Sequence, residues 1–485
     1  MAKPRISTGV AGLDDVLCGG LSPDRLYLLE GMPGSGKTTL AFQFLKEGVK
    51  HGESVLYVSL SETRAEIEDV AESHGWSLDG IAFRELVPGA EKLEPGQQYT
   101  VFHPSEVELS ETTEKIVKDV EKLRPTRIVI DSLSELRLLA GSALRYRRQI
   151  LALKHYMAGR QCTVLLLDDL TATERDVQVQ SIAHGAIMME HTTPDFGISR
   201  RRLSVIKYRG SAFRGGFHDY LIQRGGLEVY PRLVAAEHRG ETSRARLASG
   251  VTELDKLMGG GIERGTSTLI QGAAGTGKST IATLFAVEAA SRGEKSAIFM
   301  FDESVNTLQT RMAALGKDLR GLVDKGLIHL IPVDPAELSP GELVHSIRQQ
   351  VEKRQVSIVV IDSLNGYLNS MPDERFLVVQ LHELLTYLGQ SGVATMLIAA
   401  HTGLISSQMS SPVDASYLAD AVVLLRYFEV AGQVKQALSV VKMRGGDHER
   451  SLREFSTAGS KIRIGEPLRD YQGILTGVPH LRGGT

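Results

Sequence analysis

The sequence predicts an α/β fold of two tandem domains, each built from a mostly parallel sheet flanked by helices. Short apolar runs rich in Val, Ile and Leu alternate with helical stretches, as expected for strands buried under helices on both faces. One glycine-rich motif occurs twice, starting at Gly31 and at Gly272. A chain of 485 residues also has room for two domains of about 240 residues each.

The strands of the first half are expected at residues 26–30, 54–60, 127–131, 163–168 and 203–208. In an open sheet of this type, a ligand binds at the carboxyl ends of the strands. The charged segment 232–246 lacks strand periodicity and precedes the second copy of the repeat. We therefore expect a first domain at residues 1–235, a linker at 236–247 and a second domain at 248–485.

The two halves align along most of their length. Gly9 matches Gly250 at the offset of 241 residues that also separates the two glycine-rich motifs. Residues 128–133 match residues 359–364 at an offset of 231, so the second half lacks ten residues between these points. The segment 89–104, rich in Gly, Pro, Glu and Gln, is the expected extra loop of the first half.

Both glycine-rich motifs fit the P-loop pattern G-x-x-x-x-G-K-[ST], over residues 31–38 and 272–279. Glycines let the backbone N–H groups of such a loop surround phosphate oxygens, and Lys37 and Lys278 would reach the β- and γ-phosphates. The following helix points the positive end of its dipole at the phosphates. The alternative is a glycine turn with a chance lysine. The expected nucleotide-binding residues are Gly31, Pro33, Gly34, Ser35, Gly36, Lys37, Thr38 and Thr39, with Gly272, Gly275, Thr276, Gly277, Lys278, Ser279 and Thr280.

A hydroxyl and a carboxylate in each half are the predicted ligands of a magnesium ion. Thr38 and Ser279 end the two motifs, and such hydroxyls hold Mg²⁺ beside the phosphates. Asp131 and Asp362 each end an apolar strand, from which a carboxylate reaches the metal, usually through water. The alternative for each aspartate is a helix cap.

An acidic residue that follows the second strand of each half is the candidate for positioning an attacking water. These residues are Glu62 and Glu303, which lie where a carboxylate would face the γ-phosphate. Asp302 precedes Glu303 and joins the candidate catalytic set, whereas Ser61 precedes Glu62. The alternative places both glutamates at the exposed start of the next helix.

A basic pair follows an apolar strand late in each half, Lys207 with Arg209 and Lys442 with Arg444. A basic side chain on the far side of such a domain can reach the γ-phosphate in a neighbouring subunit as a finger. This role requires a ring or a filament, because one chain cannot complete its own site. The alternative is a surface hairpin.

Two other basic positions stay open. His401 follows the apolar strand 396–400, and it either senses the γ-phosphate or has no such role. The arginine run at residues 200–202 either starts a solvated strand or contributes to a subunit interface or a phosphate contact.

Bulk composition excludes some classes of protein. Lysine and arginine total 55 and aspartate and glutamate 58, and the net charge of −3 gives no general attraction to nucleic acid or to an anionic membrane. Cys18 and Cys162 are the only cysteines and lack metal-ligand spacing. The first residues hold no apolar signal core, and no apolar run reaches the length of a membrane span. We therefore expect a cytoplasmic protein that binds neither membrane nor nucleic acid.

Together these features resemble the KaiC family, the double-domain ATPases and autokinases of the circadian clock, within the RecA/DnaB-like superfamily. The resemblance covers nearly the whole chain and includes residues 7–14 and 249–255, both P-loops, and the triplets 61–63 and 302–304. Its most specific part is residues 421–455, with Val441-Lys442-Met443-Arg444-Gly445 near its centre. This stretch separates KaiC from RadA and DnaB.

The resemblance implies two tandem RecA-like P-loop NTPase domains that bind ATP and Mg²⁺. It also implies a homohexamer of two stacked rings, with the nucleotide between neighbouring subunits. The first ring would hydrolyse ATP slowly and the second would phosphorylate itself, in a clock-like, signalling or stress-regulating role. A KaiB-like partner on the first ring is compatible with the resemblance. We expect no KaiA input, because the chain stops at Thr485 where KaiC carries a longer KaiA-binding tail.

The chain also departs from the family pattern. KaiC-like kinases use an adjacent Ser-Thr pair as phosphoacceptors, and the matching positions here are Ser416 and Tyr417. Ser416 can keep this role, whereas the hydroxyl of Tyr417 lies farther from the backbone, which questions the usual two-site cycle. The alternative for the pair is a helix cap and a packing aromatic. Ser61 replaces the first of two expected acids, which predicts slower hydrolysis in the first half.

Two further functions compete with that of an ATPase and autokinase. A RadA- or DnaB-like motor on single-stranded DNA would need a basic channel, and its binding would weaken steeply with salt. A nucleotide-gated scaffold would assemble or bind a partner with negligible turnover.

Overall fold

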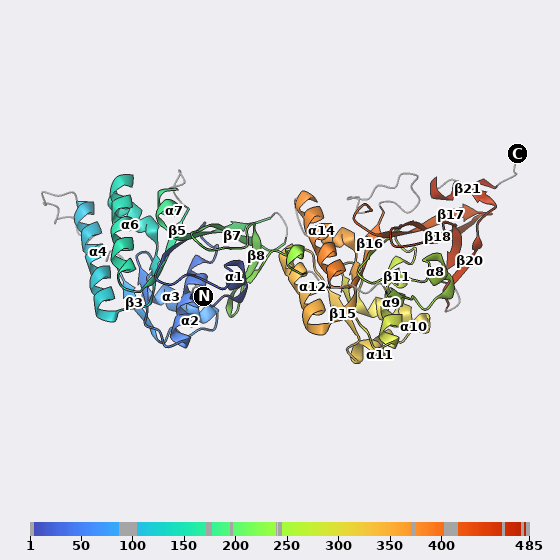
Figure 1. Cartoon of the computed structure of the whole chain (residues 1–485), viewed down its shortest axis with the longest axis horizontal. Helices are drawn as coiled ribbons and strands as arrows, with labels where there is room; N and C mark the ends of the chain where they lie inside the picture. Colours follow the sequence, from blue (N-terminus) through green and yellow to red (C-terminus); the bar gives the residue numbers. More distant parts are fainter. Residues whose placement is uncertain are drawn as a thin grey trace. The chain divides into compact units, whose positions relative to one another are not determined.

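The computed structural model describes residues 4–86, 104–170, 177–194, 197–238, 240, 245–369, 374–401, 416–457, 461–476 and 480–481. Residue contacts divide the chain into two compact units, Met1–Arg232 and Leu233–Thr485 (Figure 1). The described part of each unit contains a nine-stranded sheet flanked by helices. The prediction of two tandem α/β domains is therefore confirmed.

The sheet of the first unit is mostly parallel. Its strands are β1 (Leu26–Gly31), β2 (Val55–Ser59), β3 (Ile81–Glu85), β4 (Arg127–Asp131), β5 (Thr163–Asp169), β6 (Gly185–Thr192), β7 (Arg200–Tyr208), β8 (His218–Gln223) and β9 (Gly226–Tyr230). They lie in the order β3-β2-β4-β5-β1-β6-β7-β8-β9. The strands from β3 to β6 in this order run parallel, and the last three run antiparallel to their neighbours. All five expected strands occur, as β1, β2, β4, β5 and β7.

Helices cover both faces of this sheet. They are α1 (Ala11–Val16), α2 (Lys37–Lys50), α3 (Arg64–Ser73), α4 (Pro104–Leu123), α5 (Leu133–Ala140), α6 (Ala143–Ala158) and α7 (Val177–Ile182). Successive strand residues point to opposite faces. In β1, Tyr27 and Leu29 therefore pack with α2, whereas Leu26 and Leu28 pack with α4, α5 and α6. Because α2 continues directly from the first P-loop, this packing fixes the loop at the carboxyl edge of the sheet.

The second unit repeats the arrangement. Its main strands are β12 (Ser267–Gly272), β13 (Lys295–Met300), β14 (Ile328–Pro332), β15 (Val356–Asp362), β16 (Ala394–Ala400), β17 (Ala421–Val430), β18 (Gln433–Met443), β19 (Arg453–Ser456) and β20 (Arg463–Pro467). Their order, β14-β13-β15-β16-β12-β17-β18-β19-β20, matches that of the first sheet. The helices are α8 (Thr252–Leu257), α9 (Lys278–Ser291), α10 (Val305–Ala314), α11 (Leu319–Asp324), α12 (Pro340–Arg354), α13 (Leu364–Asn369) and α14 (Glu374–Gln390).

Small elements complete the second unit. They are the strand pairs β10 (Arg246–Leu247) with β11 (Ile262–Glu263) and β21 (Tyr471–Gln472) with β22 (His480–Leu481), and the 3-10 helices η2 (Ala235–Glu237) and η3 (Ile474–Thr476). Leu233 and Ala235 lie in the core of this unit, and the Ala235 N–H donates to Glu383 Oε2 at 3.0 Å. The boundary between the two compact units, after Arg232, thus lies just before the predicted linker at residues 236–247. The boundaries of that linker stay a prediction.

Two further predictions from the sequence concern the extra loop of the first half and the lack of a membrane span. Residues 87–103, which hold most of the expected extra loop, lie outside the described residues. Among the described helices, none combines the length and the apolarity needed to cross a membrane.

Candidate nucleotide-binding sites

Each P-loop connects the central strand of its sheet to the next helix, β1 to α2 and β12 to α9. Gly36 and Gly277 precede these helices with a φ of +92°. A Cβ would lie 2.4 Å from Ile222 on Gly36, and 2.8 Å from Phe455 on Gly277. Glycine is therefore required at both positions, as in loops that hold a phosphate with backbone N–H groups.

In the first domain, the P-loop lysine is buried inside its own loop. Lys37 Nζ donates to the carbonyl oxygens of Gly31 at 2.8 Å and Met32 at 3.2 Å. It also forms an ion pair with Asp169, with 2.7 Å between Nζ and Oδ1. The amine thus lies at the carboxyl edge of the sheet, where the predicted phosphates would bind.

The predicted magnesium ligands of the first domain meet beside this loop. Thr38 Oγ1 donates to Asp131 Oδ2 at 3.0 Å, and the Tyr57 hydroxyl donates to the same oxygen at 2.6 Å. Burial raises the pKa of Asp131, and the two hydrogen bonds oppose this rise. Hydroxyl and carboxylate oxygens are ligands that Mg²⁺ prefers, and a cation would offset the cost of burying the carboxylate charge. These residues therefore fit a magnesium ion.

Glu62 lies between β2 and α3, and its N–H donates to Ser59 Oγ at 3.0 Å. Thr63 caps α3 through a capping box with Glu66, so Glu62 is not the cap of this helix. Glu62 Oε2 is buried and has no hydrogen-bond partner among the described residues. Burial raises the pKa of Glu62, and the carboxylate of Asp131 raises it further.

The second domain brings together the same three groups. Lys278 Nζ donates to the carbonyl oxygen of Ala273 at 2.7 Å. Burial lowers the pKa of Lys278, and the nearby Asp362 opposes this shift. Burial raises the pKa of Asp362, and a hydrogen bond with Ser279 opposes that rise. A lysine, a hydroxyl and a strand-end carboxylate therefore share one edge of each sheet.

The two acids that follow β13 are both held by neighbouring side chains. Arg311 of α10 donates to Glu303 twice, from Nη1 to Oε1 at 2.5 Å and from Nη2 to Oε2 at 2.8 Å. Asp302 Oδ2 accepts a hydrogen bond from the hydroxyl of Ser363. The charge of Glu303 is therefore balanced by Arg311, whereas no described residue forms an ion pair with Glu62.

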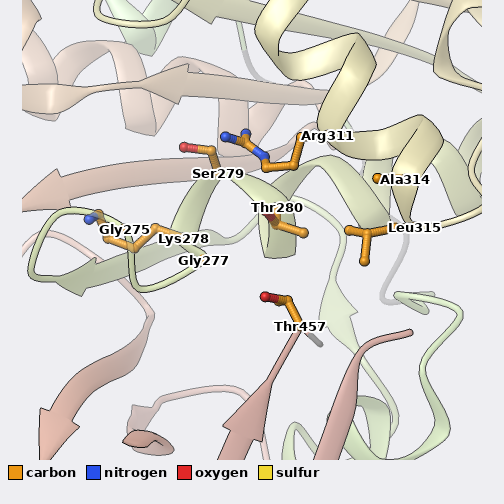
Figure 2. A pocket seen from close by; sticks show the side chains of 9 residues that line it. All are labelled: Gly275, Gly277, Lys278, Ser279, Thr280, Arg311, Ala314, Leu315 and Thr457. Atoms are coloured by element: carbon orange, nitrogen blue, oxygen red, sulfur yellow. The ribbon is translucent and has the colours of Figure 1, made fainter. Parts of the chain in front are cut away.

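A pocket of about 380 Å³ adjoins the second P-loop. Figure 2 shows the Arg311 side chain extending from α10 toward Ser279, with Leu315 and Thr457 on other sides of the space. The pocket is lined by Gly275, Gly277, Lys278, Ser279, Thr280, Arg311, Ala314, Leu315 and Thr457. Its size and its mixed apolar and polar wall suit a small organic group attached to the phosphates.

The first predicted finger pair lies away from the P-loop of its own domain. Lys207 and Arg209 occur where β7 reaches the amino end of β6, whereas the P-loop follows the carboxyl end of the neighbouring β1. Lys207 Nζ donates to the carbonyl oxygens of Gln180 at 2.7 Å and Ser181 at 3.1 Å. Arg209 Nη2 donates to the carbonyl oxygen of Ser181 at 2.6 Å.

The second pair repeats this position and contacts the predicted phosphoacceptors. Lys442 Nζ donates to the carbonyl oxygens of Ser416 at 2.8 Å and Ala419 at 2.7 Å. Arg444 Nη2 donates to the carbonyl oxygen of Tyr417 at 2.9 Å. Ser416 and Tyr417 lie in a turn before β17, and Tyr417 is 54% exposed, so its ring is not a packed core aromatic of this chain.

The two open basic positions both lie near a P-loop. Neither ring nitrogen of His401 has a hydrogen-bond partner among the described residues, and burial lowers the pKa of this histidine. Arg201 Nε donates to the carbonyl oxygen of Gly34 at 3.4 Å. Arg202 instead pairs with Glu190 at 2.7 Å. Arg201 of the arginine run thus contacts the first P-loop.

Two segments of the chain, residues 6–234 and 247–469, match the family model described as "ATPase: KaiC". The chain belongs to the KaiC family of ATPases. It is similar to the circadian clock oscillator protein KaiC of Picosynechococcus sp., with 27% identity over 483 residues that cover 98% of this chain and 92% of that relative. The circadian clock protein KaiC3 of Synechocystis sp. is 26% identical over 488 residues, which cover 98% of this chain and 94% of that relative.

The match to the KaiC family confirms the predicted resemblance and the two tandem RecA-like domains. It also gives the two P-loop sites a coarse function, ATP binding in an ATPase. The individual roles predicted for the site residues stay predictions.

Sequence reasoning missed three residues at these KaiC-family sites. The sequence could have indicated Asp169, because its apolar strand ends in two adjacent aspartates at the carboxyl end, where ligands bind in such sheets. Tyr57 is an aromatic residue within the apolar strand β2, a weaker signal. Arg311 follows Glu303 by eight residues, a spacing that no standard helical side-chain pair predicts.

Proposed function

We propose that both domains bind Mg·ATP, that the first hydrolyses it, and that the second transfers its γ-phosphate to a neighbouring copy of this chain. Lys37 and Lys278 would hold the β- and γ-phosphates. When bound, Mg²⁺ would neutralise charge that develops on the transferred phosphoryl group.

In each site, a hydroxyl and a carboxylate would hold the metal. Thr38 with Asp131 forms this pair in the first domain, and Ser279 with Asp362 forms it in the second. The hydrogen bond between the members of each pair supports the assignment, because it already places both oxygen donors beside the P-loop.

The observation that carries this proposal is the separation of the P-loop and the acceptor turn within one domain. Thr268 of β12 pairs with Ala421 of β17, and the P-loop begins at Gly272, four residues later. Four strand residues span about 13 Å. The turn with Ser416 and Tyr417 precedes Ala421 and therefore lies at the opposite edge of the sheet. A serine side chain is too short to cross this distance, which supports transfer of the phosphate from another copy.

The finger pair supports the same arrangement. Lys442 binds the backbone of the acceptor turn directly, so the two would enter a neighbour's site together. The equivalent pair of the first domain lies at the same edge of its own sheet. Repetition of one such contact around a closed ring gives the proposed homohexamer.

The proposed chemistry of the second domain is transfer to a hydroxyl. The Ser416 oxygen attacks the γ-phosphorus, the bond from this phosphorus to the β,γ-bridging oxygen breaks, and ADP leaves. Glu303 accepts the hydroxyl proton. The exposed phenol of Tyr417 is the proposed second acceptor. In the first domain, Glu62 would accept the proton of water instead, and inorganic phosphate would be released.

The printed names of the relatives suggest the biological context. Several are circadian clock proteins, and we propose a clock-like or signalling regulator with a KaiB-like partner on the first ring. Slow turnover and a phosphorylation state that builds up over time suit such a role.

Intact-mass and phosphopeptide analysis after incubation with Mg·ATP tests the kinase. We expect phosphate at Ser416, Tyr417 or both, and its loss in a Glu303→Gln variant. Ser416→Ala and Tyr417→Phe variants identify the acceptor. ADP production without any phosphorylated peptide would contradict the kinase and leave an ATPase.

Mixing two variants tests transfer between copies. One chain carries Lys278→Ala and keeps its acceptors, and the other carries Ser416→Ala with Tyr417→Phe and keeps its P-loop. We expect phosphate on the first chain only when both are mixed. Phosphate on a wild-type chain held as a monomer would contradict transfer between copies.

A further inference from the structure

The P-loop lysine of the first domain has a carboxylate partner that the second domain has replaced by a methyl group. Lys37 Nζ lies 2.7 Å from Asp169 Oδ1, and the side chains are 6% and 29% exposed. In the strand register, Gly31 of the first P-loop pairs with Asp169. Gly272 of the second P-loop pairs with Ala400 at the equivalent position. An alanine cannot bind Lys278, so the two domains differ at a position beside the phosphates.

The carboxylate of Asp169 is held in place from a second side. Ser134 of α5 donates from Oγ to Asp169 Oδ2 at 3.3 Å. Asp169 also lies close enough to Asp131 and Glu62 to raise the pKa of both carboxyl groups. The first site therefore gathers three acidic residues and one lysine.

We infer that Asp169 competes with the nucleotide phosphates for Lys37 and so weakens nucleotide binding at the first site. To reach a phosphate, the Lys37 ammonium has to leave the carboxylate or share its charge with it. The carboxylate then faces the phosphates, and like charges at short range repel. Ala400, at the equivalent position of the second site, produces neither effect.

The competition discriminates between nucleotides by charge. A γ-phosphate adds negative charge beside Asp169, so ATP meets more repulsion than ADP does. Asp169 is therefore a specificity-determining residue that lowers the preference of the first site for the triphosphate. This inference rests on the proposed role of Lys37 in holding phosphates.

Titration of the full chain with a fluorescent, non-hydrolysable Mg·ATP analogue and with fluorescent ADP tests the inference. A Lys278→Ala background isolates the first site. There we expect Asp169→Asn to tighten binding of the ATP analogue about fivefold, which is the upper end of what exposed ion pairs contribute and is exceeded by buried ones. We expect a smaller change for ADP, a difference that general loosening of the fold would not produce.

The second site offers the reciprocal test. In a Lys37→Ala background, Ala400→Asp should weaken binding of the ATP analogue about fivefold, by the same charge argument. Ala400→Asn is the matched control, because it adds similar volume without charge. This pair of variants decides the question if Asp169→Asn does not fold.

Unchanged or weaker binding of the ATP analogue in a folded Asp169→Asn variant would overturn the inference. Equal affinities of the Ala400→Asp and Ala400→Asn variants would also overturn it. A chain with both Lys37→Ala and Lys278→Ala separates this failure from failure of the proposed function. If that chain still binds the analogue tightly, the proposed role of the lysines is wrong.

Discussion

Arg311 binds Glu303 through two parallel hydrogen bonds, from Nη1 to Oε1 at 2.5 Å and from Nη2 to Oε2 at 2.8 Å. Arg311 is the eighth residue after Glu303, and the equivalent residue of the first domain, eight after Glu62, is the uncharged Val70. Two copies of one motif therefore place the same acid in different surroundings. A bidentate arginine fixes the position of a carboxylate, so the orientation of Glu303 depends on Arg311.

Replacement of Arg311 should slow the chemistry of the second site more than it weakens binding. We expect Arg311→Ala to lower the initial rate of ADP formation about tenfold in a Lys37→Ala background, because Glu303 loses its fixed orientation. Steady-state kinetics would separate kcat from KM. Arg348→Ala is the control, since Arg348 pairs with Glu352 on the surface of α12. A change in KM alone would instead assign Arg311 to nucleotide binding.

The first site should lose activity earlier than usual on acidification. Burial and nearby carboxylates raise the pKa of Glu62, so this carboxyl stays protonated to a higher pH than an ordinary glutamate. A protonated carboxyl cannot accept a proton from water. Hydrolysis in a Lys278→Ala background should therefore fall with a midpoint above about pH 4.3, the ordinary value. A constant rate down to that pH would contradict the proposed role of Glu62.

Tyr57 should tune magnesium binding in the first domain alone. Tyr57→Phe removes the 2.6 Å hydrogen bond to Asp131, while the equivalent residue of the second domain is already Ile298. Loss of a group that orients a metal ligand weakens metal affinity about tenfold or more. The Mg²⁺ dependence of nucleotide binding measures this effect. Tyr156→Phe is the control, because the hydroxyl of this α6 residue donates to Glu121 of α4 at the surface. An equal loss of magnesium affinity in Tyr156→Phe would contradict the role given to Tyr57.

Arg127 should be a main support of the first domain. Its buried guanidinium binds Glu53 at 2.8 and 2.7 Å and the carbonyl oxygens of Ser7 and Phe44. Loss of one partner of a buried ion pair costs about 3 kcal/mol, so we expect Arg127→Ala to lower the free energy of unfolding by about that amount. Urea unfolding can be followed by the fluorescence of Trp76, the only tryptophan, which lies in the first unit.

The same ion pair makes the stability pH-dependent. Arg127 holds the pKa of Glu53 below its usual range, so its contribution is present above the ordinary glutamate pKa and is lost as pH falls through the lowered value. Arg127→Ala should flatten this dependence. Arg160→Ala is the control for both predictions, because it removes an exposed arginine that stacks on Tyr156. If Arg127→Ala and Arg160→Ala unfold at the same urea concentration, the predicted loss of stability is wrong.

Much of the fold was predictable because its signals are local. The P-loops mark the junction of β1 with α2 and of β12 with α9, and apolar runs mark the buried parallel strands. The expected strands of the first half did not include β3, whose side chains are exposed or half-buried, so it lacks a continuous apolar run. They also did not include β6, although its first five residues are buried, or the antiparallel strands β8 and β9. Strand order also follows from long-range pairing, which no local window contains.

The site was predictable only in part, for a related reason. Lys37, Thr38 and Asp131 were expected together because each belongs to a short motif with a known chemical role. The ion pair of Lys37 with Asp169 joins residues far apart in the chain that meet only through strand register. The pairing of Arg311 with Glu303 depends on the path between β13 and α10. Such contacts are properties of the folded chain rather than of a motif.

The P-loop and the basic pair lie at opposite ends of the parallel strands of one sheet, so each domain has one face that binds nucleotide and another that could reach a neighbour's nucleotide. In the proposed ring, every copy would serve the neighbour on one side and be served by the neighbour on the other. A copy without Lys442 and Arg444 would silence one adjacent site while its own site still worked. The loss would therefore fall on the neighbour on one side only and leave the other neighbour unaffected.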